Sequence, residues 1–313
     1  MAYRFLKSDT SVESAVRRIA GEQIDKALVS LDATGDARAG AIHDVRKRCK
    51  KLRGLLRLVR HSFPDYPQEN AAFRDISRLL GAARDAKVLE ETYDAVLADY
   101  NGTLERAALD PVRAALTRGH EHAIGEADLD AGFAEARTMM QAARERAEHW
   151  TLGGSGLDEG WVVLGRGVAA TYRRARKAMA HAAKKPDAER QHEWRKRVKY
   201  HWYHARLLRS IWPEQMEQRA DLAKQLAELL GDHHDCHVLE ETLAAAPETY
   251  GSAEAVATIV ALARRRRALL EEQAHRLGAR LQADKTRALV ERWGEWWKAW
   301  VREDDLPPSA LGR

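Results

Sequence analysis

Two short segments of this chain hold its excess positive charge, and their cationic residues have the same spacing. Residues 43–61 contain eight Lys or Arg and one acid, and residues 192–209 contain six Lys or Arg and one acid. We call these segments stripe 1 and stripe 2. Their net charges are +7 and +5, whereas the whole chain carries +5, so the remaining residues sum to −7. Charge of one sign gathered in this way indicates an anionic partner rather than a particular fold.

The two stripes belong to a longer internal repeat. An offset of 149 residues superposes seven residues of stripe 1, namely His43, Arg46, Lys47, Arg48, Lys50, Arg57 and Arg60, on identical residues of stripe 2. An offset of 150 then superposes residues 79–92 on residues 229–242, which share Leu-Leu-Gly and Val-Leu-Glu-Glu-Thr. Two blocks in the same order predict a duplicated unit, and each unit is too long for a solenoid repeat.

The composition predicts an all-α chain, because Ala, Leu, Glu and Arg dominate and the prolines lie between periodic segments. We expect helices near 10–31, 38–61, 68–99, 105–125, 129–150, 158–184, 188–211, 214–245, 252–282 and 285–302. A capping box at Thr10 and Glu13 is expected to open the first helix. Trp293, Trp296, Trp297 and Trp300 share one face of the last helix, which is expected to bury them.

The length of 313 residues and the repeat predict two helical halves, residues 1–150 and 151–305, followed by a tail, residues 306–313. Glycine and serine at residues 151–156 supply the break between the halves. No apolar stretch is long enough to span a membrane, and the first residues lack the apolar core of a secretory signal. Cys49 and Cys236 occupy non-equivalent places in the repeat, which predicts no disulfide. These features predict a soluble cytoplasmic protein with no membrane partner.

Each stripe is amphipathic when drawn as a helix. In stripe 1 one face holds His43, Arg46, Lys47, Lys50, Arg57 and His61, with Arg53 beside it, and the opposite face holds Val45, Cys49 and Leu52. A solvated helix face usually interleaves acids three or four residues from its bases, whereas this face has almost none, so that its like charges repel. A small phosphate ester would need a glycine-rich loop, which the sequence lacks. Stripe 1 also has no aromatic platform for bases. An extended anion, either inorganic polyphosphate or a nucleic acid, therefore fits the stripes, and polyphosphate fits stripe 1 better.

These patterns resemble the signatures of the CHAD family, the conserved histidine α-helical domain. The resemblance rests on His43-x-Val-Arg46-x-x-x-Lys50, on His192-x-x-Arg195-Lys196-Arg197-x-Lys199, on the two Leu-Gly blocks and on Tyr172-Arg173-x-x-Arg176. It covers nearly the whole chain in the correct order. It implies two four-helix bundles related by a pseudo-two-fold axis, with basic faces lining a central groove or pore that binds inorganic polyphosphate.

The resemblance also implies which residues bind the anion: His43, Arg46, Lys50, Arg53, His192, Arg195 and Lys199, supported by Arg84 and Arg173. The stripes, the second block and the third motif add Lys47, Arg57, Lys87, Arg176, Lys196, Tyr203, Arg206, His234 and His237. Arg53 aligns with Trp202 and Arg84 with His234, so the two halves are expected to hold the anion unequally.

A metal site at His233, Cys236 and His237 is the alternative for the histidine cluster. Because the equivalents of His234 and His237 are Arg84 and Lys87, we expect cationic donors there and neither a metal nor a cofactor.

The sequence contains no catalytic motif, and we expect a stand-alone polyphosphate-binding protein without enzymatic activity. The alternatives are a nucleic-acid-binding helical protein, with nucleic acid otherwise only a weaker competitor, and a metal-dependent phosphohydrolase. Association with polyphosphate granules and their proteins is a further expectation.

Overall fold

The computed structural model describes residues 3–35, 37–100, 106–126, 129–152 and 156–303, and every regular element within them is helical. The predicted tail, residues 306–313, and residues 153–155 of the predicted break lie outside this part of the chain. The α-helices are α1 (Val12–Ser30), α2 (Ala37–Val59), α3 (Tyr66–Leu79), α4 (Ala82–Ala98), α5 (Asp110–Glu126), α6 (Leu129–Glu148), α7 (Gly160–Lys184), α8 (Ala188–Leu207), α9 (Pro213–Ala245), α10 (Pro247–Tyr250), α11 (Ala253–Leu281) and α12 (Thr286–Arg302). Three short 3-10 helices are η1 (Arg106–Ala108), η2 (Leu157–Glu159) and η3 (Arg209–Ile211). The predicted all-α class is confirmed.

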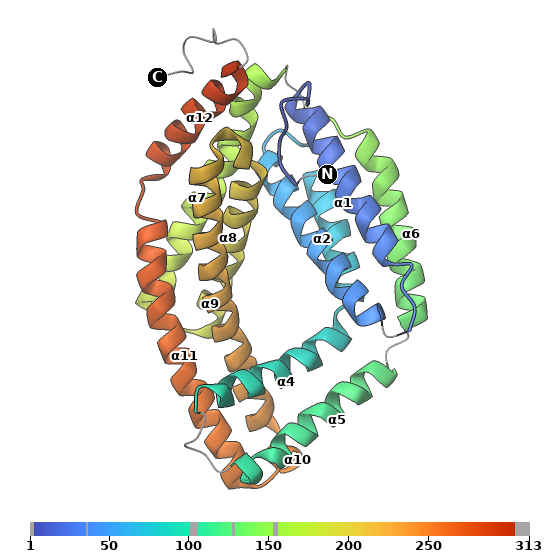
Figure 1. Ribbon diagram of the computed structural model, residues 1–313, viewed down its shortest axis with the longest axis vertical. Helices are drawn as coiled ribbons and strands as arrows, with labels where there is room; N and C mark the ends of the chain where they lie inside the picture. Colours follow the sequence, from blue (N-terminus) through green and yellow to red (C-terminus); the bar gives the residue numbers. More distant parts are fainter. Residues whose placement is uncertain (1–2, 36, 101–105, 127–128, 153–155, 304–313) are drawn as a thin grey trace.

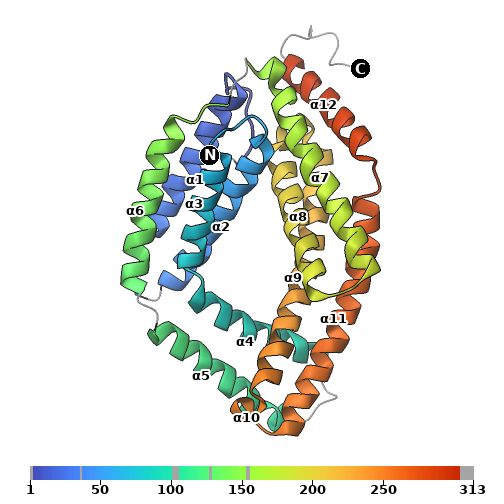
Figure 2. The ribbon, with the colours of Figure 1, turned by 180° about the vertical axis from the view of Figure 1, so that it is seen from behind.

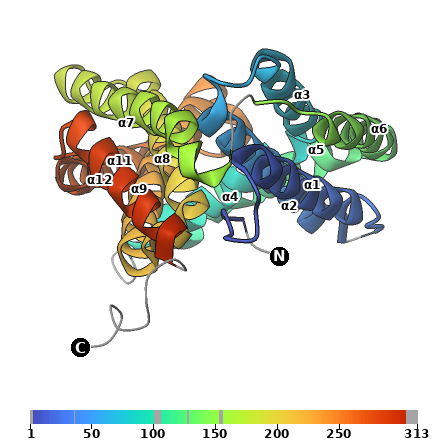
Figure 3. The ribbon, with the colours of Figure 1, turned by 90° about the horizontal axis from the view of Figure 1, so that it is seen from above.

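The helices form two groups that lie side by side (Figures 1 and 2). In the first group α1 packs against α2 and α6, and α3 packs against α2 and α6. In the second group α8 packs between α7 and α9, α11 packs along α9, and α12 packs on α7. Helix α2 contacts both α7 and α8, so it joins the two groups, as the view from above shows (Figure 3).

Helices α4 and α5 leave the first group and reach the far ends of α9 and α11 (Figure 1). There Tyr93 and Val96 of α4 form an apolar cluster with Leu239 and Leu243 of α9. The largest apolar cluster likewise combines residues before and after position 150, for example Leu55 and Tyr172. The apolar packing therefore crosses the boundary between the two sequence halves. Within the described residues, no helix is both long and apolar enough to cross a bilayer.

Three of the four tryptophans that were expected to be buried in α12 are buried, whereas Trp296 is half-buried. Trp293 and Trp297 are fully buried, and Trp300 is 8% exposed. Trp297 packs edge-on against Phe5 and donates a hydrogen bond from Nε1 to the carbonyl oxygen of Leu157, at 3.0 Å. Full burial of a large apolar side chain contributes about 1.5–3 kcal/mol to folding, so these rings hold α12 against the core.

The single helix predicted over residues 68–99 is wrong, because the chain breaks at Leu80 and Gly81 into α3 and α4. Arg46 of α2 donates from Nη1 to the carbonyl oxygens of Ser77 and Leu80, at 2.8 and 3.3 Å. These bonds satisfy backbone acceptors that the end of α3 leaves without an intrahelical partner. The equivalent Leu-Leu-Gly sequence of the second half continues uninterrupted through α9.

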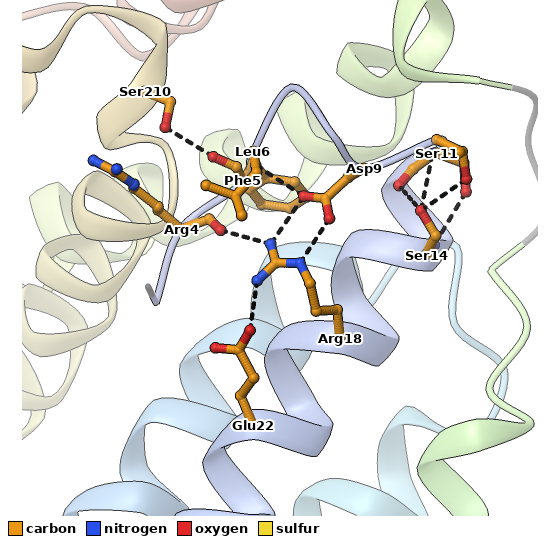
Figure 4. Close-up of polar contacts among 10 residues, drawn as sticks. Arg4, Phe5, Leu6, Asp9, Ser11, Ser14, Arg18, Glu22 and Ser210 are labelled. Atoms are coloured by element: carbon orange, nitrogen blue, oxygen red, sulfur yellow. Dashed lines mark hydrogen bonds and ion pairs between the residues drawn. The ribbon is translucent and has the colours of Figure 1, made fainter. Parts of the chain in front are cut away.

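The capping box that opens α1 lies one residue later than predicted. Ser11, and not Thr10, is the N-cap, and its hydroxyl accepts from the backbone N–H of Ser14 at 3.0 Å (Figure 4). The Ser14 hydroxyl accepts from the backbone N–H of Ser11 at 3.0 Å in return. Glu13, which was expected to complete the box, instead accepts from the backbone N–H of Leu152 at 2.8 Å.

Candidate anion-binding site

Helices α2 and α8, which carry the two stripes, pack directly against each other. His204 donates from Nε2 to the carbonyl oxygen of Gly54 at 3.2 Å. A Cβ atom on Gly54 would lie 2.8 Å from Cβ of Tyr203, so a larger residue would separate the helices. Burial lowers the pKa of His204 to about 3, so the ring is neutral at pH 7 and donates without carrying charge. This contact fixes stripe 1 and stripe 2 relative to each other.

A cavity of about 670 Å³ lies between the stripes, and we call it the central cavity. Ten of the predicted residues line it: His43, Arg46, Lys47, Lys50, His192, Arg195, Lys199, Tyr203, Arg206 and His234. Lys51 raises the number of lining Lys and Arg to seven, whereas Glu228 and Asp235 are the two lining acids. Glu228 also pairs with Lys224, at 3.4 Å. The lining of this cavity is therefore strongly cationic.

The conserved spacing of the two sequence blocks has a direct structural counterpart. Arg46 lies against Gly81, and its equivalent Arg195 lies against Gly231. A Cβ atom on Gly81 would lie 3.0 Å from Nη1 of Arg46, and one on Gly231 would lie 2.8 Å from Nη2 of Arg195. Glycine thus leaves room for the guanidinium group in both halves. The Nε atoms of Arg46 and Arg195 are buried without a hydrogen-bond partner among the described residues.

His192 and His234 meet at the wall of the central cavity, with ring centroids 4.4 Å apart. Burial, followed by the neighbouring His234, Lys196 and Arg195, lowers the pKa of His192 to about 4. Burial also lowers the pKa of His234. Both rings are therefore neutral at pH 7 in the free protein, and a bound anion would favour their protonation. The Nδ1 atoms of both are buried without a hydrogen-bond partner in the described part of the chain.

Of the predicted residues whose side chains the structure describes, seven do not line the central cavity: Arg53, Arg57, Lys87, Arg173, Arg176, Lys196 and His237. Arg53 donates to Asn70 at 3.1 Å, and the guanidinium of Arg57 lies 4.1 Å from the ring centroid of Tyr200. Lys196 pairs with Glu193 at 2.6 Å. Lys87 lies 3.9 Å from Glu91, His237 contacts Arg267 and Glu241, Arg173 is exposed and Arg176 is half-buried. The side chain of Arg84 lies outside the described residues.

The histidine cluster of α9 does not converge on one point. His233 lies 3.8 Å from Glu271, whereas His237 lies 2.9 Å from a nitrogen of Arg267. Burial raises the pKa of Cys236 to about 12, which keeps this thiol protonated and disfavours metal ligation. Among the described residues, no group of three or more His, Cys, Asp or Glu side chains is arranged to hold a metal ion.

Seven residues that line the central cavity were absent from the predicted set, among them one further cation, Lys51, and one indole, Trp202. Lys51 is only 7% exposed, and burial lowers its pKa to about 7. Trp202 stacks on Tyr203, with ring centroids 4.9 Å apart. Lys51 lies within stripe 1, beside the cationic face, and this position in the sequence could have indicated that it lines the cavity. Nothing in the sequence showed that α8 covers this side of α2.

Comparison with known proteins agrees with this architecture. The uncharacterized protein MT2285 of Mycobacterium tuberculosis is 28% identical over 251 residues, which are 74% of this chain and 46% of that protein. The chain thus spans less than half the length of this relative. The crystal structure of the CHAD domain from the plant Ricinus communis has a TM-score of 0.63 at 20% identity, over 91% of this chain and 96% of that one. The family model of the CHAD domain matches residues 18–244, and the chain therefore belongs to the CHAD domain family.

Proposed function

We propose that this chain binds inorganic polyphosphate in the central cavity and does not turn it over. The observation that carries the proposal is the lining of that cavity by seven Lys or Arg and two acids, drawn mainly from two duplicated stripes. Membership of the CHAD family, which is associated with polyphosphate binding, supports the same ligand. Polyphosphate carries one negative charge per phosphate unit. It can therefore compensate the positive charge of the cavity lining, for which the neighbouring helices supply only two acids.

The proposal includes the arrangement implied for the family, in which two related helical halves place their basic faces along a shared groove. The pairing of Arg46 with Gly81 and of Arg195 with Gly231 supports this arrangement, since equivalent residues make equivalent contacts in each half. Lys50 and Lys199 occupy equivalent sequence positions and line the same cavity. An extended, repetitive anion suits two matched sets of donors better than a single phosphate ester does.

Binding without hydrolysis follows from the same charges. Cleavage of a phosphoanhydride usually relies on a divalent cation that neutralises the phosphoryl oxygens. In the central cavity the carboxylates of Glu228 and Asp235 are outnumbered by cations that repel such an ion. Those cations neutralise the phosphates in place of a metal.

A protein of this kind is expected in the cytoplasm at polyphosphate granules, beside granule proteins. A fluorescent fusion would test this location.

Nucleic acid is the second candidate, and Trp202 favours it. The indole lines the central cavity and is half-buried, and a base can stack on such a ring. However, the Trp202 ring already stacks on Tyr203 and lies 5.3 Å from the guanidinium of Arg206, which leaves less of the ring available to a base. The phosphate backbone alone would therefore provide most of the affinity for nucleic acid.

Competition distinguishes the two ligands. Long-chain polyphosphate should displace a labelled single-stranded oligonucleotide at a phosphate concentration at least about 10-fold below that of unlabelled oligonucleotide. A plot of log affinity against log salt should have a slope of about −5 if seven cations each release a counterion from a flexible polyanion. The same mixture with Mg²⁺ or Mn²⁺ should release no orthophosphate. Equal displacement by both polymers would favour nucleic acid, and released orthophosphate would favour a hydrolase.

A further inference from the structure

A second cavity, of about 810 Å³, opens beside the central one, and we call it the outer cavity. Its walls come from the N-terminal segment, α1, α2, α8, η3 and α9. The lining residues with charge are Arg4, Lys26, Arg48, Lys51, Arg206, Arg209, Glu217, Asp221 and Lys224. Glu217 forms an ion pair with Arg209. The outer cavity therefore has an excess of cations, and none of the sequence motifs had marked it as a site.

The two cavities meet at three side chains, because Lys51, Trp202 and Arg206 line both. The guanidinium of Arg206 lies 5.6 Å from the ring centroid of Tyr3 and 5.3 Å from that of Trp202. The Lys51 ammonium lies 5.2 Å from the Tyr3 ring. An aromatic face restricts the position of a cation that lies on it. The junction between the cavities is thus cationic.

The N-terminal wall of the outer cavity is fixed by hydrogen bonds. Phe5 donates from its backbone N–H to the carbonyl oxygen of Leu207 at 3.0 Å, and Ser210 donates to the carbonyl oxygen of Phe5 at 2.8 Å. Arg18 pairs with Asp9 at 2.7 Å and donates to the carbonyl oxygen of Arg4 at 2.9 Å. Figure 4 shows the Arg4 side chain pointing away from this network. The carboxylate of Asp9 is therefore taken by Arg18, and Arg4 is held at the cavity wall.

Two arginines of the outer cavity have a donor atom that makes no hydrogen bond to the described residues. The Nε atoms of Arg4 and Arg48 are buried without a hydrogen-bond partner in the part of the chain that the structure describes. Arg48 uses Nη1 to donate to Gln23 at 3.2 Å, a neutral partner that leaves its charge uncompensated. A buried donor without an acceptor costs free energy that an anion would restore.

The repeat places different residues at the equivalent positions of the other half. Arg57 is the equivalent of Arg206, and Tyr200 is the equivalent of Lys51. Arg57 rests on Tyr200 at 4.1 Å, whereas Arg206 faces the second cation, Lys51. Arg197, the equivalent of Arg48, forms an ion pair with Glu193. At these three positions the residues of the outer cavity therefore carry more uncompensated charge than their equivalents in the repeat.

We infer that the outer cavity is a second phosphate-binding site, and that one polyphosphate chain runs from the central cavity past Lys51, Trp202 and Arg206 into it. This inference rests on the proposed function and extends it to a dependence on chain length. A short polyphosphate occupies the central cavity alone, and a long one occupies both. The five cations that line only the outer cavity, Arg4, Lys26, Arg48, Arg209 and Lys224, supply the additional contacts.

Variants of residues that line only the outer cavity test the inference. Arg4→Gln combined with Lys26→Gln should lower the affinity for long-chain polyphosphate at least about 10-fold, because two charge-assisted contacts are lost. The affinity for tripolyphosphate should stay unchanged. The matched control is Lys285→Gln with Lys298→Gln, two exposed lysines at α12. Isothermal calorimetry with polyphosphates of graded length measures all of these.

The outcomes separate this inference from the proposed function. If the unmodified protein binds no polyphosphate of any length, the proposed function fails. If it binds, but the Arg4 and Lys26 variant binds every length as the unmodified protein does, only the outer cavity is refuted. An equal loss for long and short chains would also refute it, because the two residues would then affect the central cavity.

Lys51 provides a second test, at the junction. Burial, and the charges of Arg206, Arg48, Lys47 and Lys26, lower its pKa to about 7. Tyr3 packs on Lys51 with a raised pKa. The other charged groups that line the outer cavity are Arg4, Arg209, Glu217, Asp221 and Lys224. The other charged or titratable groups that line the central cavity are His43, Arg46, Lys50, His192, Arg195, Lys199, Tyr203, Glu228, His234 and Asp235. Above pH 7 the amine is mostly neutral in the free protein. A phosphate chain beside it raises its pKa, so binding takes up a proton, and affinity falls as pH rises above 7.

Calorimetry at pH 8 in two buffers of different ionisation enthalpy measures this proton. Long-chain polyphosphate should bind the unmodified protein with an uptake that approaches one proton per chain. Lys51→Arg keeps the charge at all these pH values, so its uptake should be smaller and its affinity should change less between pH 7 and 9. Equal uptake by both proteins would show that the chain does not pass Lys51.

Discussion

Reversing the charges of Lys50 and Lys199 together is expected to lower the affinity for long-chain polyphosphate about 100- to 1,000-fold, as two charge-assisted contacts of about 1.5–2 kcal/mol each are lost. The two lysines occupy equivalent positions of the repeat and line the same cavity. Each Lys→Glu change also adds a negative charge beside the ligand, which repels the chain. The slope of log affinity against log salt should decrease in magnitude, because fewer counterions are released.

The matched control is Lys285→Glu with Lys298→Glu, which changes the net charge by the same amount on α12. This control should bind polyphosphate as the unmodified protein does, apart from a small effect of net charge. Circular dichroism should give the same helix content for all three proteins. An unchanged affinity of the Lys50 and Lys199 variant, with its helices intact, would refute the central cavity as the binding site.

Lysines serve this test better than the arginines beside them. Arg46 and Arg195 face the same cavity, and their sequence positions make them equally strong candidates as ligands. However, Arg46 also donates to Ser77 and Leu80 at the end of α3, so its reversal would disturb that helix end as well as the ligand. Arg46 thus faces the cavity and also supports the end of α3.

The sequence predicted much of the site because an amphipathic helix has a fixed relation between spacing and face. Residues such as Lys50 and Lys199 share the cationic faces, and those faces line one cavity. The spacing along one helix does not show where another helix covers that face. Arg53 and Arg57 share the face of Lys50, yet they lie near the contact of α2 with α8 and bind Asn70 and the Tyr200 ring instead. Only the packing of three helices decides this.

The break between α3 and α4 lay beyond sequence reasoning for a related reason. Leu80-Gly81 and Leu230-Gly231 are identical in sequence, but the first pair ends a helix and the second lies within α9. The shared Leu-Gly sequence therefore does not by itself end a helix. Tertiary contacts decide the outcome, since α4 must turn to bury Tyr93 and Val96 against Leu239 and Leu243. Duplicated sequence predicts shared contacts, not shared helix lengths.

The contact of α2 with α7 gives the largest expected effect on stability. A Cβ atom on Gly167 of α7 would lie 1.7 Å from the carbonyl oxygen of Leu58 and 2.8 Å from its Cα atom. Both are backbone atoms, so a change of rotamer cannot relieve the clash, and α2 and α7 must move apart. Gly167→Ala is expected to lower the free energy of unfolding by about 3 kcal/mol. Thermal denaturation should show a decrease in Tm of about 6–12 °C.

Gly40→Ala is the matched control, because Gly40 lies within α2 and a Cβ atom there meets nothing within 4 Å. That substitution should raise stability by about 0.5–1 kcal/mol, as alanine is the better helix former. Since α2 carries stripe 1, Gly167→Ala should also weaken polyphosphate binding, whereas Gly40→Ala should not. Equal melting temperatures for the two variants would contradict the close approach of α7 to α2, and with it the placement of stripe 1 at the central cavity.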